Sequence, residues 1–351
     1  MNQEDRKNQN KSFRPAGGRV LLQSVLKHIP RRGDGVMEGA ALGLDAAIFQ
    51  NGEITELQAV GVQPSSRFPE EYPLTAGEAA WITAENQLAT KGIIKEASFA
   101  AQILLVAGIS CPESRIRREM QRLTQFSVRR GCRIVGGNTV FFQEGEDCLV
   151  QVVLTGRSSG ETYRPEQESK LRMQPGDRVY FFGEVGCLGA DLLVKRNREM
   201  LQKRFADSYI DTMEYDASDF SVKEKAAAAL SAGAVFLHDV SNSGVHAALY
   251  QLAEAAGCGI RVRHEGLTVR QSVVELSEFL NINPYQLLGT GGLLAVVPAE
   301  TADEFERRIP TGFHWAYAGE LTKEKARLVT AESFHMERYL NLPEGDALEE
   351  V

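Results

Sequence analysis

The sequence predicts an α/β protein built from two domains. The chain of 351 residues is longer than the roughly 250 residues over which one hydrophobic core usually extends. Short apolar runs of strand character alternate with longer segments of helical periodicity along the whole chain. With 43% apolar and 25% charged residues, the composition is that of an ordinary globular protein and excludes a fibre or a membrane bundle.

The first half of the chain predicts a hairpin, two helices and three further strands. Strands over Leu42–Phe49 and Leu57–Val62 flank an Asn-Gly pair, which favours a hairpin turn. A helix over Thr75–Lys91 begins with a capping box formed by Thr75 and Glu78. The remaining elements, in chain order, are a strand at Gln102–Ala107, an arginine-rich helix at Pro112–Arg130, and strands at Arg133–Phe142 and Cys148–Thr155.

The second half follows a polar, proline-containing linker at Gly156–Gly176. Gly183, Gly186 and Gly189 then connect a strand at Arg178–Phe182 to a helix. Their spacing is not G-x-G-x-x-G, so we interpret them as a strand-to-helix turn rather than a dinucleotide site. The later elements, in chain order, are a helix at Lys223–Ala232, a strand at Ala234–Leu237, a helix ended by Gly257, a strand at Ile260–Arg263, a helix at Arg270–Asn281, a strand within Gly291–Pro298, a helix at Thr301–Arg308 and a strand at Ala316–Leu321.

Positive charge is concentrated at the start of the chain. The first 32 residues hold eight Lys and Arg against two Asp and Glu, a balance of +6. Because the net charge of the whole chain is -8, the remaining residues carry -14. We interpret residues 1–16 as a disordered, solvated basic arm rather than a nucleic-acid site. The arginines of Pro112–Arg130 alternate with Ile116, Met120 and Leu123 at helical spacing, which is typical of the exposed face of an amphipathic helix.

The cysteines and the apolar runs indicate a cytoplasmic protein. Five scattered cysteines form no C-x-x-C pair, which argues against a disulfide framework and a zinc site. No apolar run approaches the ~20 residues that span a bilayer, and Met1–Phe13 lacks the apolar segment of a secretory signal. Cys258 lies between two glycines, and we interpret it as a small buried residue.

Four polar motifs lie beside predicted strands and helices: Gly43–Ala47, Glu85–Ala89, Gly136–Thr139 and His238–Ser241. Each motif alone is weak, because glycine and Asx residues are common in turns. In this order, and with the late strand Gly292–Pro298, they resemble the aminoimidazole ribonucleotide (AIR) synthase superfamily. The resemblance is greatest to the hydrogenase maturation factor that dehydrates a thiocarbamoyl group, and it covers about Gly18–Thr322.

This resemblance implies a domain organisation and a nucleotide site. An N-terminal domain at 17–157 would form a β-barrel with its twin in a homodimer, followed by an α/β C-terminal domain at 158–340 and a tail at 341–351. ATP would bind the first-domain motifs, with Mg²⁺ held by Asp45, and Asp239 would act as the catalytic residue on the acceptor side. The residues implied to contact the nucleotide are Asn86, Gln87, Gly136, Gly137, Asn138 and Thr139. The resemblance also implies a maturation-type partner protein. It implies no binding to a membrane or to a nucleic acid.

The sequence departs from the family pattern at several charged positions. Gln87 and Asn138 stand where relatives carry aspartate. Relatives have a further carboxylate at a strand end, and Val62–Ser65 occupies that place in this sequence. An amide keeps an oxygen but lacks the charge that attracts Mg²⁺. Two hypotheses follow: an enzyme that activates an amide- or carboxy-type oxygen by ATP-dependent phosphorylation, or a catalytically degenerate paralogue that acts as a binding or scaffold protein. The ending Asp346–Val351 has no counterpart of the cysteine that carries the thiocarbamoyl group.

Two further interpretations concern the segment around His238. His238 and His246 lack an obvious third ligand, so we interpret them as capping or hydrogen-bonded histidines rather than a metal site. Asp239 has an equally supported structural alternative, in which its carboxylate braces the turn before the helix and Ser241 or Asn242 forms the N-cap.

Overall fold

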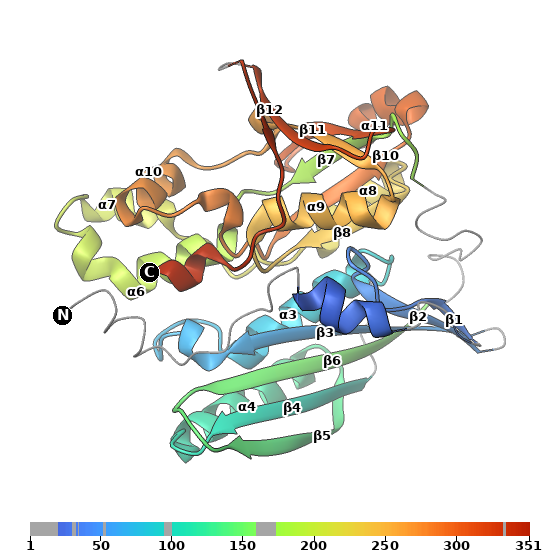
Figure 1. Ribbon diagram of the computed structural model, residues 1–351. Helices are drawn as coiled ribbons and strands as arrows, with labels where there is room; N and C mark the ends of the chain where they lie inside the picture. The colour runs from blue at the N-terminus through green and yellow to red at the C-terminus, as the bar shows by residue number, and fades with distance from the viewer. Residues whose placement is uncertain are drawn as a thin grey trace.

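The computed structural model describes residues 20–29, 33, 35–51, 54–94, 100–158, 173–332 and 335–351. Within these ranges the chain forms two α/β domains that pack against each other, each built on one β-sheet (Figure 1). The predicted two-domain α/β fold class is therefore confirmed. The proposed basic arm at 1–16 lies outside the described residues, as does most of the proposed linker.

The first domain is a six-stranded sheet in the order β1-β2-β3-β6-β4-β5. Its elements are β1 (Val36–Glu38), β2 (Ala46–Asn51), β3 (Ile54–Pro64), α3 (Ala76–Ala89), β4 (Ala100–Gly108), α4 (Glu113–Arg129), β5 (Arg133–Phe142) and β6 (Cys148–Ser158). Strands β2 and β3 form the predicted hairpin, with Asn51 opposite Ile54. Strand β6 continues to Ser158 because it pairs with β3 as far as Thr55, so the linker begins later than expected.

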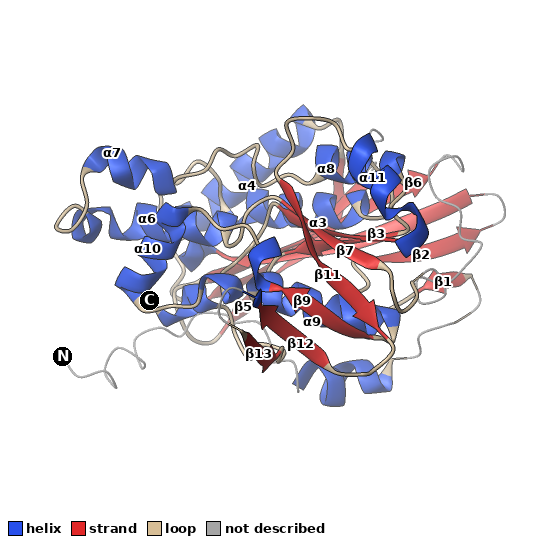
Figure 2. Ribbon diagram, turned by 90° about the horizontal axis from the view of Figure 1, so that it is seen from above, coloured by secondary structure: helices blue, strands red, loops and turns tan. Residues whose placement is uncertain are grey.

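The second domain is a seven-stranded sheet in the order β13-β12-β9-β11-β7-β10-β8. Its principal elements are β7 (Arg178–Phe182), α6 (Cys187–Leu201), α7 (Asp207–Ile210), α8 (Lys223–Ala232), β8 (Phe236–Val240), α9 (Gly244–Ala256), β9 (Gly259–Arg263), α10 (Gln271–Leu280), β10 (Gly292–Val297), α11 (Ala302–Arg308), β11 (Trp315–Thr322), β12 (Arg327–Ala331) and β13 (Met336–Tyr339). Alternate residues of β7 face opposite sides of the sheet. Phe181 packs with the α9 residues, and Phe182 packs with those of α8 and α11. These helices cover opposite sides of the sheet (Figure 2).

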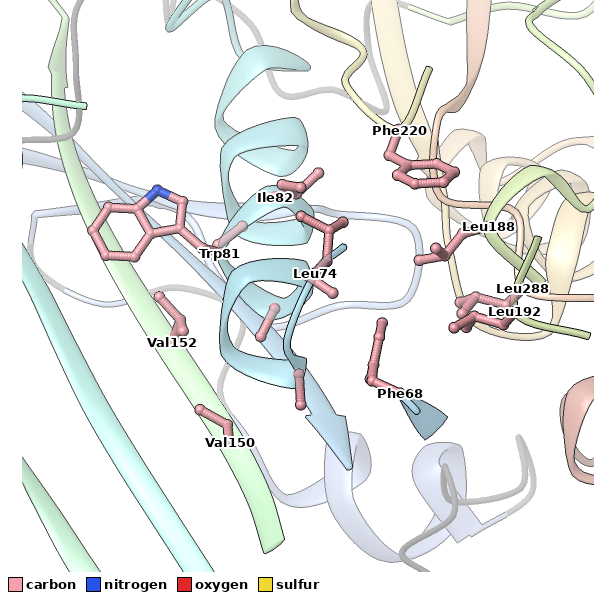
Figure 3. Packing of buried hydrophobic residues seen from close by; sticks show 14 of the residues in the cluster. Phe68, Leu74, Trp81, Ile82, Val150, Val152, Leu188, Leu192, Phe220 and Leu288 are labelled. Carbon is pink, nitrogen blue, oxygen red and sulfur yellow. The ribbon is translucent and has the colours of Figure 1, made fainter. Parts of the chain in front are cut away.

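Helix α3 is the layer between the two domains. Trp81 on one side of the helix points toward Val152 of β6, whereas Ile82 points toward Leu188 and Leu192 of α6 (Figure 3). The helix is rich in alanine and carries apolar side chains around its circumference, as expected of a helix without a solvent-facing side. A single hydrophobic cluster therefore continues from the first-domain sheet into the second domain.

Helix α3 begins as the sequence predicts, and α4 packs against that start. The hydroxyl of Thr75 accepts a hydrogen bond from the Glu78 N–H, and the Glu78 carboxylate accepts one from the Thr75 N–H, which completes the capping box. On α4, Leu123 is buried, and the guanidinium of Arg122 lies 2.7 Å from the Glu78 carboxylate. The arginine-rich face thus fixes α4 to the start of α3, consistent with its interpretation as an amphipathic helix.

The structure corrects the prediction made from the sequence in the region of β8. We expected a strand that ended at Leu237, with His238 and Asp239 in the following loop. Instead both residues lie inside β8, where Asp239 pairs with Leu293 of β10, and both are buried. The strand can hold polar side chains because the first domain supplies their partners.

The last part of the chain also contains structure that the sequence did not predict. Strands β12 and β13 extend the second sheet. In the segment expected as a tail, Ala347 and Leu348 are buried. All five cysteines lie within the described ranges and are buried thiols outside any disulfide, consistent with the interpretation of Cys258. No helix within the described ranges is both long and apolar enough to cross a bilayer.

Close packing of α3 on β3 should depend on Gly61. A Cβ atom at this position would lie 1.8 Å from the carbonyl oxygen of Ala80. We expect Gly61→Ala to lower the free energy of unfolding by about 3 kcal/mol, because helix and strand would have to separate. Urea denaturation measures this change. The control Gly345→Ala adds the same methyl group where no heavy atom lies within 4 Å and should not destabilise the protein. Equal effects of both variants would contradict this packing.

Candidate functional site

Ionisable side chains from both domains meet at one buried place. Asp45 directly precedes β2 in the first domain, whereas His238 and Asp239 belong to β8 in the second. Their ligand-type atoms lie within 4.8 Å of one another. The side chains of Asp45 and His238 are each 4% exposed. We call these three residues the Asp45 cluster.

His238 connects the two domains within this cluster. Its Nδ1 atom lies 2.5 Å from Oδ1 of Asp45, and its Nε2 atom lies 3.0 Å from the side-chain oxygen of Gln251 on α9. The other oxygen of Asp45 accepts a hydrogen bond of 3.1 Å from the backbone N–H of Asp239. Both carboxylate oxygens of Asp45 are therefore held by the second domain.

Burial and mutual charge set the protonation of the cluster. Burial would raise the pKa of Asp45, but the positive charges of His238 and Lys91 bring it below its ordinary value. Burial opposes the protonation of His238, yet the Asp45 carboxylate raises the pKa of its imidazole. Burial together with Asp45 raises the pKa of Asp239 well above its ordinary value. The arrangement thus favours an ionised Asp45, a protonated His238 and a neutral Asp239.

A second buried ion pair borders the Asp45 cluster. The ammonium group of Lys91, just beyond α3, lies 2.9 Å from the carboxylate of Glu38 on β1, and these side chains are 3% and 5% exposed. The same ammonium lies 5.1 Å from the ring centroid of Phe236, the first residue of β8. Positive charge from the first domain therefore reaches the strand that carries His238 and Asp239.

The donor set of the Asp45 cluster fits a divalent cation. Carboxylate oxygens are the ligands that Mg²⁺ prefers. The raised pKa of Asp239 arises in part from the neighbouring negative charge of Asp45. A cation beside both carboxylates would compensate this repulsion and favour the ionised form of Asp239. Asp45 and Asp239 are thus the residues that could hold the metal.

The structure places Asn86 and Gln87 against protein backbone. The amide of Asn86 donates to the Phe220 carbonyl at 2.8 Å and accepts from the Val222 N–H at 3.0 Å. The amide oxygen of Gln87 accepts from the Val60 N–H at 3.1 Å. Asn86 therefore joins α3 to the second domain, and Gln87 joins α3 to β3.

The motif Gly136–Thr139 lies on β5, the outer strand of the first sheet, and is exposed. Asp45 precedes β2, which three intervening strands separate from β5. At a strand spacing of about 4.8 Å, these two strands lie roughly 19 Å apart. One chain therefore brings Asp45 and Asp239 together but leaves Gly136–Thr139 at the far edge of the sheet.

His246 does not belong to the Asp45 cluster. Its ring stacks on Tyr285 with a centroid distance of 5.2 Å, and burial lowers its pKa to about 4. The sequence analysis treated the two histidines alike, as capping or hydrogen-bonded residues, and did not identify the polar partners of His238 or the pair formed by Lys91 and Glu38. Helix periodicity alone gave no signal for these residues, because their partners come from other elements.

The comparisons identify relatives of both domains. Residues 174–330 match the family described as AIR synthase related protein, C-terminal domain. Carbamoyl dehydratase HypE from Azotobacter vinelandii is 25% identical over 282 residues, which cover 76% of this chain and 78% of the relative. HypE from Rhodobacter capsulatus is 27% identical over 187 residues, and this match spans about half of each protein, 53% of this chain and 52% of the relative.

Solved structures show the same fold. HypE in complex with ATP has a TM-score of 0.59 at 17% identity, covering 93% of this chain and 95% of that chain. AaThiL complexed with AMPPCP and TMP has a TM-score of 0.61 at 19% identity, with coverages of 92% and 96%. HypE in the HypE–HypF complex has a TM-score of 0.62 at 16% identity, with coverages of 84% and 93%.

The match of residues 174–330 relates the second domain to the AIR synthase family, and the whole chain has the fold of HypE and AaThiL. Among AIR synthase-like proteins it is similar to the hydrogenase maturation protein HypE. The resemblance expected from the sequence motifs is therefore confirmed, as is the two-domain fold that it implies.

His238 should stabilise the protein in a pH-dependent way. With EDTA present, we expect His238→Gln to lower the free energy of unfolding by about 3 kcal/mol near pH 6, because Asp45 would lose its buried counter-charge. The folded state raises the pKa of His238 from 6.5, so its contribution is complete below pH 6.5 and disappears as the pH rises through the folded value. Asp45, with its lowered pKa, remains ionised in this range.

Urea unfolding of both proteins at pH 6 and pH 9 measures this effect. The exposed residue His28 provides the control, and His28→Gln should leave stability unchanged at both pH values. A stability difference between wild type and His238→Gln that is the same at both pH values would contradict the ion pair.

Proposed function

We propose that this protein binds ATP, or a related phosphorylated ligand, and activates an amide- or carboxy-type oxygen by ATP-dependent phosphorylation. The Asp45 cluster, buried where the two domains meet, is the observation that carries this proposal. The fold supports it, because HypE has been solved with ATP and AaThiL with AMPPCP and TMP. The similarity to carbamoyl dehydratase HypE supports the same class of acceptor.

In this proposal each residue of the cluster has a separate role. Asp45 is the principal ligand of Mg²⁺, and His238 holds its carboxylate in position. Asp239 lies on the acceptor side, where its carboxyl group can hold or release a proton, because burial favours its neutral form and a neighbouring cation favours its ionised form. Bound magnesium would supply positive charge to the transferring phosphoryl group. Lys91 adds a fixed positive charge beside Asp45.

We further propose that the protein is a homodimer joined through β5. This strand is one of the two edge strands of the first sheet within the described residues. Its apolar residues Val135, Val140, Phe141 and Phe142 are 60%, 43%, 56% and 52% exposed, respectively. A long apolar edge strand favours pairing with another strand, and two identical copies commonly pair about a two-fold axis. A phosphate contact from Gly136–Thr139 to a nucleotide at the Asp45 cluster would then come from the second copy.

A partner protein and a cellular location complete the proposal. HypE has been solved in complex with HypF, and we propose a maturation-type partner for this chain as well. Its free, buried cysteines are compatible with action in the cytoplasm.

Nucleotide binding should depend on magnesium and on Asp45. At an ATP concentration a hundred times its Kd, ligand binding should stabilise wild type by about 2.7 kcal/mol. We expect Asp45→Asn to weaken Mg²⁺-dependent ATP binding at least tenfold, because the metal would lose its ionised ligand. Asp239→Asn should keep most of the binding but reduce ADP release. Thermal shift with and without Mg²⁺, followed by an ADP-release assay, measures both effects.

The control for this experiment is Asp177→Asn. Asp177 is also a buried carboxyl with a raised pKa, but it bonds to the Gln174 N–H at the start of β7. This variant should respond to ATP as wild type does. If wild type binds ATP without releasing ADP, the protein acts as a binding or scaffold protein. If neither wild type nor any variant responds to ATP, the proposal of nucleotide binding is wrong.

Dimerisation should depend on the apolar edge of β5. Light scattering at micromolar concentration should give about twice the 38.7 kDa of one chain. We expect Phe141→Lys to shift the protein to monomer, since a charge would have to be buried in the interface. Met336→Lys changes a residue of similar exposure on β13 and should remain a dimer. A wild-type monomer, or a Phe141→Lys dimer, would count against this interface.

A further inference from the structure

A small cavity lies between α4 and the loop that follows β3. Its volume is about 230 Å³. The polar residues that line it are Ser65, Ser66, Glu70, Arg115, Arg118 and Glu119. All of its lining residues belong to the first domain, so the cavity does not include the junction of the two domains. We call it the α4 cavity.

The α4 cavity is separate from the Asp45 cluster. Ser65 directly follows the last residue of β3. Asp45 directly precedes Ala46, which pairs with Ala59 of β3. Six residue steps of extended chain, at about 3.3 Å each, place Ser65 roughly 20 Å from Ala59. A small molecule in the α4 cavity would therefore not touch the Asp45 cluster.

Both arginines of the cavity bind uncharged groups of the protein. Arg115 donates a hydrogen bond of 3.0 Å to the carbonyl oxygen of Glu146, and Arg118 donates to the carbonyl oxygen of Glu70. A guanidinium has five N–H donors, so each arginine keeps donors that can bind a carboxylate. The two residues are three positions apart on α4 and therefore lie on the same side of the helix. This side of the cavity suits a carboxylate group.

Glu119 supplies a carboxyl group at the buried side of the cavity. It is 2% exposed, and its Oε2 atom accepts a hydrogen bond of 3.0 Å from the Gly77 N–H. Burial raises the pKa of Glu119, and the hydrogen bonds at the start of α3 and the charge of Arg118 only partly oppose this effect. A cationic group in the cavity would favour the ionised form of Glu119. This side of the cavity therefore suits an ammonium group.

The two serines hold the loop that forms one wall of the cavity. The hydroxyls of Ser65 and Ser66 donate to the carboxylate of Asp147 at 2.9 and 2.7 Å. The same carboxylate accepts from the backbone N–H groups of Ser66 at 2.9 Å and Cys148 at 2.8 Å. These bonds fix the loop to the start of β6. The wall is thus formed before any ligand binds, which lowers the entropic cost of binding.

We propose that the α4 cavity binds a small α-amino acid in its zwitterionic form. Arg115 and Arg118 would bind its carboxylate, and Glu119 would bind its ammonium group. The lining holds two arginines and two glutamates, which match a ligand that carries both charges and no net charge. The cavity is smaller than the roughly 300–1,000 Å³ typical of pockets for drug-sized ligands. Only Phe68 and Pro69 complete the lining, so the side chain of the amino acid must be small.

Calorimetric titration with L-alanine, in the presence of EDTA, tests this proposal. Wild type should bind L-alanine at least tenfold more tightly than propionate, which lacks the ammonium group, or ethylamine, which lacks the carboxylate. Arg118→Gln and Glu119→Gln should each weaken L-alanine binding at least tenfold, because each removes a charged partner. The controls Arg117→Gln and Glu113→Gln remove the same charges from an exposed ion pair on the same helix and should bind as wild type does.

Amide chemical shifts of the wild-type protein provide a second measurement, should the lining variants fail to fold. L-alanine should shift the amide resonances of Ser66 and Glu119, which line the cavity. The amides of Tyr180 in β7 and Asp239 in β8 lie in the second domain and should not shift.

Three results would overturn the proposal. The first is that wild type shows no saturable binding of L-alanine. The second is that propionate or ethylamine binds as tightly as L-alanine. The third is that folded Arg118→Gln and Glu119→Gln bind as wild type does or, if neither folds, that the Ser66 and Glu119 amides do not shift. None of these results bears on magnesium-dependent ATP binding at the Asp45 cluster.

Discussion

The burial of α3 on both sides is the constraint on which the two-domain arrangement depends. Trp81 completes the core beneath the first sheet, and Ile82 completes the contact with α6, so the two cores share one helix (Figure 3). Gly61 lets the helix approach β3 closely, and the amide of Asn86 bonds to the second domain. Because interiors are close-packed, the two sheets cannot shift relative to each other without disturbing this helix.

This fixed junction gives the Asp45 cluster its electrostatic character. Asp45 and His238 are positioned by different domains, yet their atoms approach to 2.5 Å in a place that water scarcely reaches. Removing such charges from water costs several kcal/mol per ion, so a buried ion pair is weak evidence for stability alone. Ionisable groups with strongly shifted pKa values are, in contrast, typical of functional sites. That physical argument favours chemistry at the junction over a purely structural role.

Local patterns in the sequence predicted the elements, whereas the site depended on contacts between distant residues. The hairpin, the Thr75 capping box and the amphipathic α4 follow from neighbours within a few positions, and the structure confirms them. Asp45 and Asp239 are 194 positions apart, and Ser65 and Asp147 are 82 apart. Periodicity carries no information at such separations. The motif resemblance identified Asp45 and Asp239, but it could not show that Gly136–Thr139 lies at the opposite edge of the sheet.

The shared helix also has a consequence for synthesis on the ribosome. The side of α3 that carries Ile82 faces α6, whose last residue, Leu201, is made 112 positions after Ala89 at the end of α3. At about 5–20 residues per second, translation of that interval takes roughly 6–22 s. Throughout that time the emerging first domain presents an uncovered apolar surface, which is the kind of surface that chaperones bind. The nascent chain should therefore cover this side of α3 only after α6, the first helix of the second domain, has left the exit tunnel.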